Sequence, residues 1–407
     1  MTSDVTGQAA RHALSARLDT ALARLETPPS TPTYAVDLDA FDANAADLAR
    51  RAAGTPIRVA PKSLRVPALV ERALAAPGFH GVLAYTLREA LWLHARGIAD
   101  DLLLGYPTVD PAALAALTCD PGAAAAITLM VDDVAHLDVV DAARTGDVTV
   151  RVALDVDAGL RIGSAHVGPK RSPLHDTGQV VDLARAVVDR PGFALVGVMT
   201  YEGQVAGVPD DVPAQRARSL VVRRVKSASV AQLAHRRAEI AEALRMLTDL
   251  ELWNAGGSGS IETSAADPVV TEVSAGSGLL VPALFDHYRS FAPRPAAFFA
   301  VPVVRRPSGD CVTVAGGGLV ASGPTGKDRS PLPWAPPGLH LTGLEGAGEV
   351  QTPLVGPGAA SLHVGDRVWF RHAKAGEPAE HVREAHLVSG STVVDTVPTY
   401  RGTGNAW

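Results

Sequence analysis

Short apolar runs rich in β-branched residues alternate along the chain with longer stretches in which apolar residues recur every three or four positions. The short runs are typical of buried strands, and the longer spacing is typical of amphipathic helices. Strands are expected at residues 33–37, 57–60, 81–86, 101–105, 124–131, 148–155, 194–200 and 250–254, with a further strand-like piece at 271–274. Helices are expected at residues 8–26, 38–53, 66–76, 87–96, 111–117, 133–143, 179–189 and 214–248.

This alternation of strand and helix predicts an α/β fold, a parallel (β/α)8 barrel of the TIM type. An open, doubly wound sheet is the alternative, and the number of strands favours the barrel. After about residue 290 the helical spacing disappears, and short β-type runs stand among dense glycine and proline. This pattern of short apolar runs, glycine and proline predicts an all-β domain. The sequence therefore divides into an N-terminal helical extension (1–30), a barrel (31–289) and a C-terminal β domain (290–407).

The composition of the chain argues against several classes of protein. The chain has 407 residues, of which 47% are hydrophobic and 20% charged, as in a globular protein. Its formal net charge of −6 gives no reason to expect nucleic acid or an anionic membrane as a partner. The two cysteines, Cys119 and Cys311, are far apart, and no signal peptide or membrane-spanning run is recognised. These features predict a cytoplasmic protein with reduced thiols.

Lys62 is the first candidate for chemistry. Five of the 37 basic residues are lysines, and this one directly follows the apolar run at 57–60 and Pro61. A primary amine can form an imine with an aldehyde, which a guanidinium cannot do. The alternative is a lysine at a strand end whose stem packs on the core and whose ammonium reaches water.

The second candidate is the run Asn254-Ala255-Gly256-Gly257-Ser258-Gly259-Ser260, which follows the strand expected at 250–254. Its backbone amides and hydroxyls can converge on an anion, and barrels often bind phosphate beside their last strands. A flexible loop is the alternative. An amine and a phosphate site at one barrel mouth together suit pyridoxal 5'-phosphate (PLP), which needs both.

Several motifs carry a resemblance to a known family. The chain resembles the fold-type III PLP-dependent enzymes, which have an alanine racemase-type barrel, and within them the D-threonine aldolase and D-serine dehydratase-like branch. It is also similar to bacterial proteins called amino acid deaminase/aldolase. The motifs are residues 31–39, Pro61-Lys62-Ser63, Met199-Thr200-Tyr201-Glu202-Gly203, residues 254–260, Glu272-Val273-Ser274-Ala275-Gly276-Ser277, residues 362–366 and residues 371–377.

The resemblance implies roles for individual residues. Lys62 would hold the cofactor through an imine, Arg161 would lie near its ring or phenolic oxygen, and Tyr201 would lie at the ring edge. The alternative for Tyr201 is an ordinary tyrosine at the edge of the core. The other cofactor-binding residues expected are Asn254, Gly256, Gly257, Ser258, Gly259 and Ser277.

The resemblance also implies a divalent metal, zinc or manganese, held in the β domain by a His-x-Cys or His-x-Asp pair. The nearest match is His372-Ala373-Lys374, which supplies His372 but no second ligand, because lysine is normally protonated. The missing ligand would have to be Glu377, Glu380 or His381, each of which also fits a solvated loop. Alternatively, Lys374 replaces the metal as a fixed cation.

Three functions remain open from the sequence. The favoured one is a PLP-dependent lyase acting on a D-3-hydroxy amino acid, as an aldolase or a dehydratase. The second is a racemase, which needs another base; Tyr288 and Tyr400 are the tyrosines after the barrel. The third is a non-catalytic PLP-binding protein, against which the β domain argues. The resemblance further implies a homodimer in which each β domain covers the partner's barrel mouth.

Overall fold

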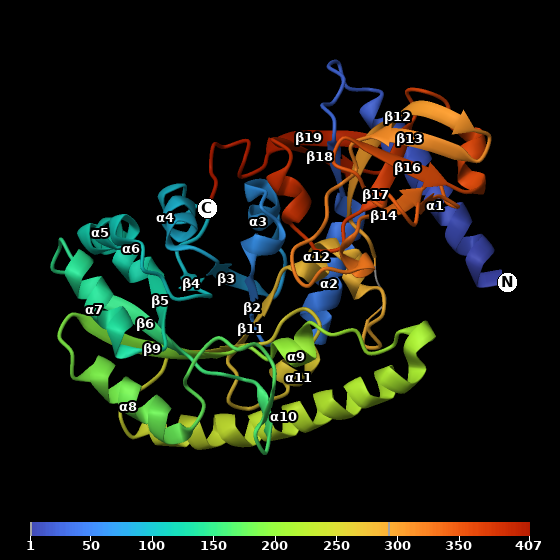
Figure 1. The fold of residues 1–407 in the computed structure, drawn as a ribbon. Helices are drawn as coiled ribbons and strands as arrows, with labels where there is room; N and C mark the ends of the chain where they lie inside the picture. Colours follow the sequence, from blue (N-terminus) through green and yellow to red (C-terminus); the bar gives the residue numbers. More distant parts are fainter. Residues whose placement is uncertain (1, 292–293) are drawn as a thin grey trace.

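The structure is a computed structural model that describes residues 2–291 and 294–407. Eight parallel strands close into a barrel in the order β10-β11-β2-β3-β4-β5-β6-β9, which confirms the predicted fold class (Figure 1). The barrel strands are β2 (Ile57–Val59), β3 (Phe79–Ala84), β4 (Leu102–Leu104), β5 (Ile127–Val131), β6 (Val150–Asp155), β9 (Phe193–Thr200), β10 (Leu252–Ala255) and β11 (Glu272–Ala275).

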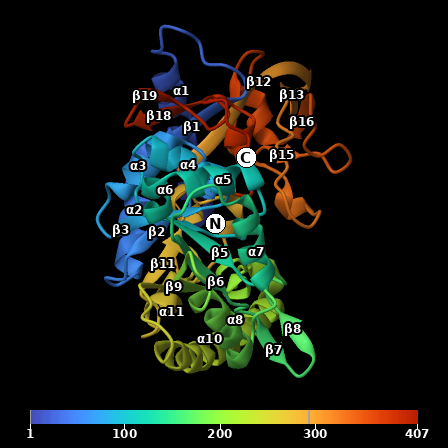
Figure 2. The same ribbon diagram turned by 90° about the vertical axis from the view of Figure 1, so that its left-hand side faces the viewer.

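Helices surround the barrel and connect its strands (Figure 2). They are α2 (Leu38–Arg51), α3 (Pro67–Leu74), α4 (Leu87–Ala95), α5 (Pro111–Cys119), α6 (Pro121–Ala126), α7 (Val134–Ala143), α8 (Thr177–Val188), α9 (Gly203–Ala206), α10 (Arg216–Arg245), α11 (Ile261–Ala265) and α12 (Ser277–Leu280). Side-chain caps begin several of them: Asp37 accepts from two amides of α2, and Thr86 accepts from the amide of Glu89 in α4. Because helices cover the strands from outside and side chains fill the centre, β2 and β4 are buried throughout; β4 is entirely leucine, whereas β2 buries Arg58 between Ile57 and Val59.

The second part of the molecule is a mixed sheet with the main strand order β15-β16-β13-β12-β1-β18-β19, to which β14 and β17 are added. Its strands are β1 (Thr33–Asp37), β12 (Ala297–Ser308), β13 (Cys311–Ala315), β14 (Leu332–Ala335), β15 (His340–Leu341), β16 (Gln351–Val355), β17 (Arg367–Arg371), β18 (Glu384–Ser389) and β19 (Thr392–Pro398). This sheet forms the predicted β domain beside the barrel mouth (Figure 1).

One strand prediction is wrong. Residues 33–37 were expected to open the barrel, but β1 pairs antiparallel with β12 and parallel with β18 inside the β domain. The eighth barrel strand is instead β11, the strand-like piece at 271–274, which pairs with β10 and β2. All five residues of β1 are buried, so its apolar run fits either sheet equally well. Which sheet β1 joins depends on its partner strands, β12 and β18, which lie far away in the sequence.

The N-terminal helix α1 (Thr2–Leu22) packs on the β domain. Leu18 and Leu22 are buried in a cluster with Phe298 and Trp369. Arg17 pairs with Asp37 at the end of β1. None of the helices described in residues 2–291 and 294–407 combines the length and hydropathy that a membrane crossing requires.

Candidate active site

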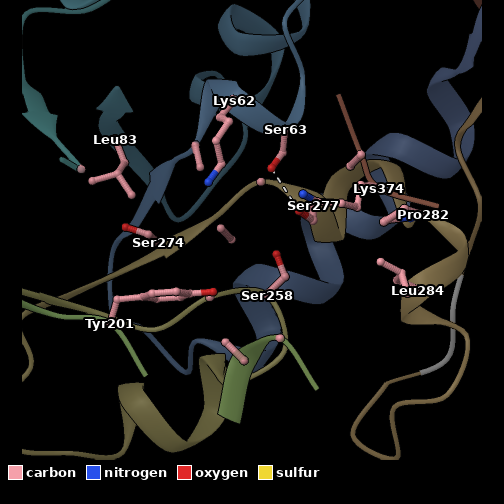
Figure 3. Close-up of a pocket in the computed structure, with 18 of the residues that line it drawn as sticks. Lys62, Ser63, Leu83, Tyr201, Ser258, Ser274, Ser277, Pro282, Leu284 and Lys374 are labelled. Carbon is pink, nitrogen blue, oxygen red and sulfur yellow. Dashed lines mark hydrogen bonds between the residues drawn. The ribbon is translucent and has the colours of Figure 1, made fainter. Parts of the chain in front are cut away.

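A cavity of about 450 Å³ opens at the carboxyl ends of the barrel strands, between them and loops of the β domain (Figure 3). Loops after six barrel strands line it, in agreement with the usual position of barrel active sites. The barrel contributes Lys62, Ser63, Arg65, Tyr106, Arg171, Tyr201, Asn254, Gly256, Gly257, Ser258 and Ser277, among others. The β domain contributes Ser322, Arg329, Lys374 and Glu377.

Lys62 lies in the cavity, as the sequence predicts. It belongs to a single turn of 3-10 helix (Pro61–Ser63) that directly follows β2. Figure 3 shows its side chain directed into the space that Tyr201 and Ser258 border from the other side. Its Nζ donates a hydrogen bond of 2.7 Å to the hydroxyl of Tyr106. The amine is therefore accessible from the cavity and is oriented by a phenol.

Tyr106 is a site residue that the sequence reasoning missed. It follows β4 by two positions, so the rule that strand ends carry the active site could have found it. Burial raises the pKa of its phenol, but the Lys62 charge and hydrogen bond, together with Arg171, outweigh burial and leave the pKa below its ordinary value. The hydroxyl of Tyr106 thus accepts from Lys62 at 2.7 Å and fixes the direction of the amine.

The predicted position of Arg161 beside the cofactor is not what the structure contains. Arg161 lies on the small hairpin after β6, where its side chain pairs with Asp157 at 3.4 Å. Its backbone amide donates to the side-chain oxygen of Gln232 on α10, and its carbonyl oxygen accepts from the side-chain nitrogen of the same residue. It does not line the cavity. Arg171, ten residues later in the same long loop, does: its guanidinium lies 5.5 Å from the ring centre of Tyr106 and 5.6 Å from that of Tyr201.

Tyr201 lines the cavity directly after β9, as expected. Burial, with the nearby Glu202 charge in addition, raises the pKa of its phenol to about 12. The phenol therefore stays neutral near neutral pH, and its flat side faces the cavity rather than water. This geometry suits contact with an aromatic ring.

The glycine–serine run is organised by a buried carboxylate, Glu202. Its oxygens accept from the Gly256 amide at 3.3 Å, the Ser260 hydroxyl at 2.6 Å and the Arg237 guanidinium at 3.1 Å. The Gly257 amide donates to the Ser260 hydroxyl at 3.1 Å. Gly256 and Gly257 line the cavity, but their amides are already engaged and do not point to an added anion. Glu202 stood in the motif at 199–203, yet no role was predicted for it.

Ser258 and Ser277 contribute backbone amides that remain available to an anion. The Ser277 hydroxyl lies 3.0 Å from that of Ser63, and the Ser258 hydroxyl accepts from the Gly278 amide at 2.9 Å. Across residues 2–291 and 294–407, the backbone amides of Ser258 and Ser277 have no hydrogen-bond partner in the protein. Two amides and two hydroxyls at one wall are a suitable donor set for a phosphate.

Close packing explains the glycines of this run as well as anion binding does. Gly256 has φ of +78°, a conformation that favours glycine. A β-carbon added to Gly257 would lie 3.1 Å from the Ala206 side chain, and one added to Gly259 would lie 2.2 Å from the Ala206 carbonyl oxygen. Gly259 is packed against Ala206 and does not line the cavity, contrary to the sequence prediction.

Asn254 lines the cavity floor, as predicted, but its amide is engaged in the barrel itself. Its Nδ2 donates to Glu272 at 2.8 Å and to the Ser274 hydroxyl at 2.9 Å, both on β11. Asn254 therefore ties β10 to β11 beneath the cavity.

The side chains present do not fit a metal site. His372 is buried outside the cavity, where its Nδ1 accepts from the Lys374 amide at 3.0 Å. Burial lowers the pKa of its imidazole. Glu380 pairs with Arg65 at 2.8 Å, and the oxygens of Glu377 accept from Ser322. In the part of the chain that the structure describes, no three His, Cys, Asp or Glu side chains are arranged to hold a metal ion, and His381 does not complete one.

The family model described as "Alanine racemase, N-terminal domain" matches residues 36–282. A D-threonine aldolase from Arthrobacter sp is 29% identical over 258 residues, which cover 63% of this chain and 61% of that relative. The chain thus spans less than two thirds of the length of this relative.

Solved structures share the fold. The D-threonine aldolase of Filomicrobium marinum superimposes with a TM-score of 0.72, at 24% identity over 92% of this chain and 95% of that one. The D-threo-3-hydroxyaspartate dehydratase of Delftia sp. HT23 gives a TM-score of 0.70, at 22% identity over 93% and 98% of the two chains. The alanine racemase of Corynebacterium glutamicum gives 0.56, at 17% identity over 88% and 99%. Because the family model spans more than half of the sequence and both domains recur in these structures, the chain belongs to the alanine racemase N-terminal domain family of PLP-type barrels.

Proposed function

We propose that this chain is a PLP-dependent lyase that acts on a D-3-hydroxy amino acid, by aldol cleavage or by dehydration. One observation carries the proposal. The amine of Lys62 and the unpaired backbone amides of Ser258 and Ser277 lie in the same cavity. The names of the D-threonine aldolase and D-3-hydroxyaspartate dehydratase relatives support the reaction class.

The residues present fit PLP. Lys62 would hold the aldehyde covalently, and Ser258 and Ser277 would bind the phosphate. Tyr201 and Arg171 would border the ring. When bound, PLP withdraws electrons from the α-carbon of an amino acid, so that a bond at this carbon can break.

The charge of the cavity fits such ligands. Of its charged lining side chains, one is a carboxylate, Glu377, and the others are cations: Lys62, Arg65, Arg171, Arg329 and Lys374. A phosphate and an amino-acid carboxylate both carry negative charge, so their binding reduces the repulsion among these cations. The Lys62–Tyr106 hydrogen bond keeps the amine oriented toward the cavity and gives it a nearby group with which to exchange a proton.

One assay distinguishes the reactions. The protein loaded with PLP is incubated separately with D-threonine and D-serine. Glycine with acetaldehyde identifies an aldolase, and pyruvate with ammonia from D-serine identifies a dehydratase. The L-isomer alone would instead identify a racemase, and no product from any D-3-hydroxy amino acid would contradict the proposal.

The covalent role of Lys62 has its own test. Lys62→Ala is expected to lose the visible absorbance of bound cofactor, because no amine remains to hold the aldehyde, and to lose activity by roughly a thousandfold or more. The matched control is Lys327→Ala, which removes an exposed lysine that does not line the cavity. An absorbance unchanged in Lys62→Ala would show that another group holds the cofactor.

The racemase alternative has less support. The Tyr288 hydroxyl donates to the Ala206 carbonyl oxygen at 2.8 Å, and the Tyr400 hydroxyl donates to Glu89 at 2.7 Å. Both tyrosines after the barrel are therefore engaged within their own chain.

The proposal also includes the homodimer implied by the resemblance, and sedimentation velocity at several protein concentrations tests it.

A further inference from the structure

The loop after β17 brings the β domain against the barrel turn that carries Lys62. A β-carbon added to Gly376 in this loop would meet the Lys62 carbonyl oxygen and would lie 2.8 Å from the carbonyl carbon of Ser63. The Ser63 hydroxyl is in turn 3.0 Å from that of Ser277. The loop therefore lies next to the wall to which the cofactor phosphate is assigned, and Figure 3 shows Lys374 of this loop beside Ser277.

The ammonium of Lys374 is held in place by two other side chains. Its Nζ donates to the Ser322 hydroxyl at 2.7 Å and lies 3.2 Å from a carboxylate oxygen of Glu377. Glu377 also accepts from the amide of Ser322 at 2.9 Å and from its hydroxyl at 2.6 Å. A lysine ammonium carries three N–H donors, so these two contacts leave one for a ligand in the cavity that the residue lines.

The barrel wall that offers the phosphate donors has no positive charge of its own. Residues 254–260 and 272–280, which supply Ser258 and Ser277, contain neither lysine nor arginine. A phosphate monoester carries between one and two negative charges near pH 7. Amides and hydroxyls donate hydrogen bonds to it but do not balance this charge, so a cation from another part of the chain is needed.

The three cations that the barrel brings to the cavity are engaged elsewhere. Lys62 would be joined to the aldehyde of the cofactor. Arg65 pairs with Glu380 at 2.8 Å. The guanidinium of Arg171 lies 5.5 Å from the ring centre of Tyr106, the phenol that accepts from Lys62, and so borders the aldehyde side of the site. The balancing charge therefore has to come from the β domain.

We propose that Lys374 binds the phosphate of the cofactor together with Ser258 and Ser277, so that the β domain completes a cofactor site begun by the barrel. This inference rests on the proposed function, since it requires PLP as the cofactor. A hydrogen bond between an ammonium and a phosphate oxygen joins two charged groups and is stronger than one between neutral groups. Ser322 and Glu377 are positioning residues, because they act on the phosphate through the lysine.

The experiment compares two ligands that differ by the phosphate alone. The full-length protein is freed of cofactor with hydroxylamine and dialysis, and it is titrated separately with PLP and with pyridoxal while the absorbance of the bound aldehyde is followed. Lys374→Met is expected to weaken PLP binding by roughly tenfold or more, because a charge-assisted hydrogen bond is lost, and to leave pyridoxal binding within about twofold. Unchanged PLP affinity, or an equal loss for both ligands, would overturn the inference.

Two control variants separate direct contact from general charge. Lys327→Met removes an exposed lysine of the same domain outside the cavity and should bind both ligands as the wild type does. Arg329→Met removes another cation that the β domain contributes to the cavity. It should lower the ratio of PLP affinity to pyridoxal affinity less than Lys374→Met does. An equal fall in this ratio would mean that only the summed charge of the cavity matters, and it would also overturn the inference.

A second variant covers the case in which Lys374→Met does not fold. Ser322→Ala keeps the ammonium but removes one of its anchors, so it should weaken PLP binding while pyridoxal binding stays within about twofold. PLP affinity equal to that of the wild type in Ser322→Ala would then count against the inference. The proposed function fails separately: a wild type that binds PLP through Lys374 but releases no product from any D-3-hydroxy amino acid would contradict the lyase and leave the phosphate contact standing.

Discussion

At the scale of single residues, Glu89 is a carboxyl group that the protein encloses outside the cavity. It is fully buried in α4, and it accepts from the Tyr85 amide at 2.8 Å and from the Tyr400 hydroxyl at 2.7 Å. Burial raises the pKa of this carboxyl to about 8, against a partial lowering by the two hydrogen bonds. The pair with Tyr400 joins the C-terminal segment to the barrel.

This raised pKa predicts a pH-dependent stability. Between the ordinary glutamate pKa of about 4.3 and about 8, the folded state keeps a proton that the unfolded state has lost. The contribution of neutral Glu89 is thus complete below the unfolded pKa and decreases as pH rises, by up to about 1.4 kcal/mol per pH unit. Glu89→Gln should be more stable than the wild type at pH 9 and similar at pH 4, as measured by urea unfolding.

The matched control is Glu71→Gln, which neutralises an exposed glutamate on α3. It should leave the difference in unfolding free energy between pH 4 and pH 9 unchanged. If Glu89→Gln also left this difference unchanged, Glu89 would ionise in the folded protein as it does in water.

At the scale of elements, Arg58 connects four strands of the barrel. It lies on β2, its guanidinium pairs with Glu272 of β11 at 2.6 Å, and it pairs with Asp101 just before β4 at 2.8 Å. It also donates to the Val82 carbonyl of β3 at 3.4 Å. The Arg58 side chain is 2% exposed and that of Glu272 is 9% exposed, whereas Asp101 is 37% exposed and also pairs with His80, so Glu272 is the carboxylate that depends most on Arg58.

Removing this arginine should be costly. Arg58→Met leaves the buried Glu272 without its charged partner, and breaking a buried ion pair in this way typically costs about 3–5 kcal/mol of unfolding free energy. Arg151→Met is the control, because Arg151 pairs with Glu251 at the same 2.6 Å but on the surface, where 27% and 56% of the two side chains are exposed. The surface pair should contribute at most about 1 kcal/mol. Equal losses for the two variants in urea unfolding would contradict the role of burial.

At the scale of the whole molecule, the chain visits the β domain twice. It enters through α1 and β1, forms the barrel, and returns at β12. Because β1 lies between β12 and β18, the sheet is complete only with a strand from the beginning of the chain. Asn44 of α2 adds a link near the return, since its Nδ2 donates to the carbonyl oxygens of Leu279 and Arg294.

This path predicts the behaviour of fragments. Residues 294–407 alone should not fold cooperatively, because β12 and β18 would each expose an unpaired edge at the centre of the sheet. Joining residues 2–37 to this fragment through a flexible linker should restore a folded β domain. Near-UV circular dichroism and a cooperative thermal transition measure the outcome, and a cooperative transition in the short fragment alone would refute the prediction.

The sequence by itself determined the barrel, the β domain and the central lysine. Strands covered on both sides are mostly apolar, so their runs are visible without knowing any partner. Lys62 stands out because a basic residue directly after such a run has to leave the core at the active end of the barrel. Tyr201 and Ser258 follow from the same rule, whereas Ser277 was implied by the family resemblance, and all three line the cavity.

Only the tertiary structure decided which sheet received β1, which arginine faced the cavity and which amides remained free. Each of these depends on contacts between residues far apart in the sequence. Arg161 and Arg171 share one long loop, and the path of that loop over α10 turns the first outward and the second inward. Glu202 accepts a hydrogen bond from the amide of Gly256, which lies 54 residues later in the sequence. A local pattern of polar and apolar positions carries no information about such partners, because it records which side chains are buried and not what they meet.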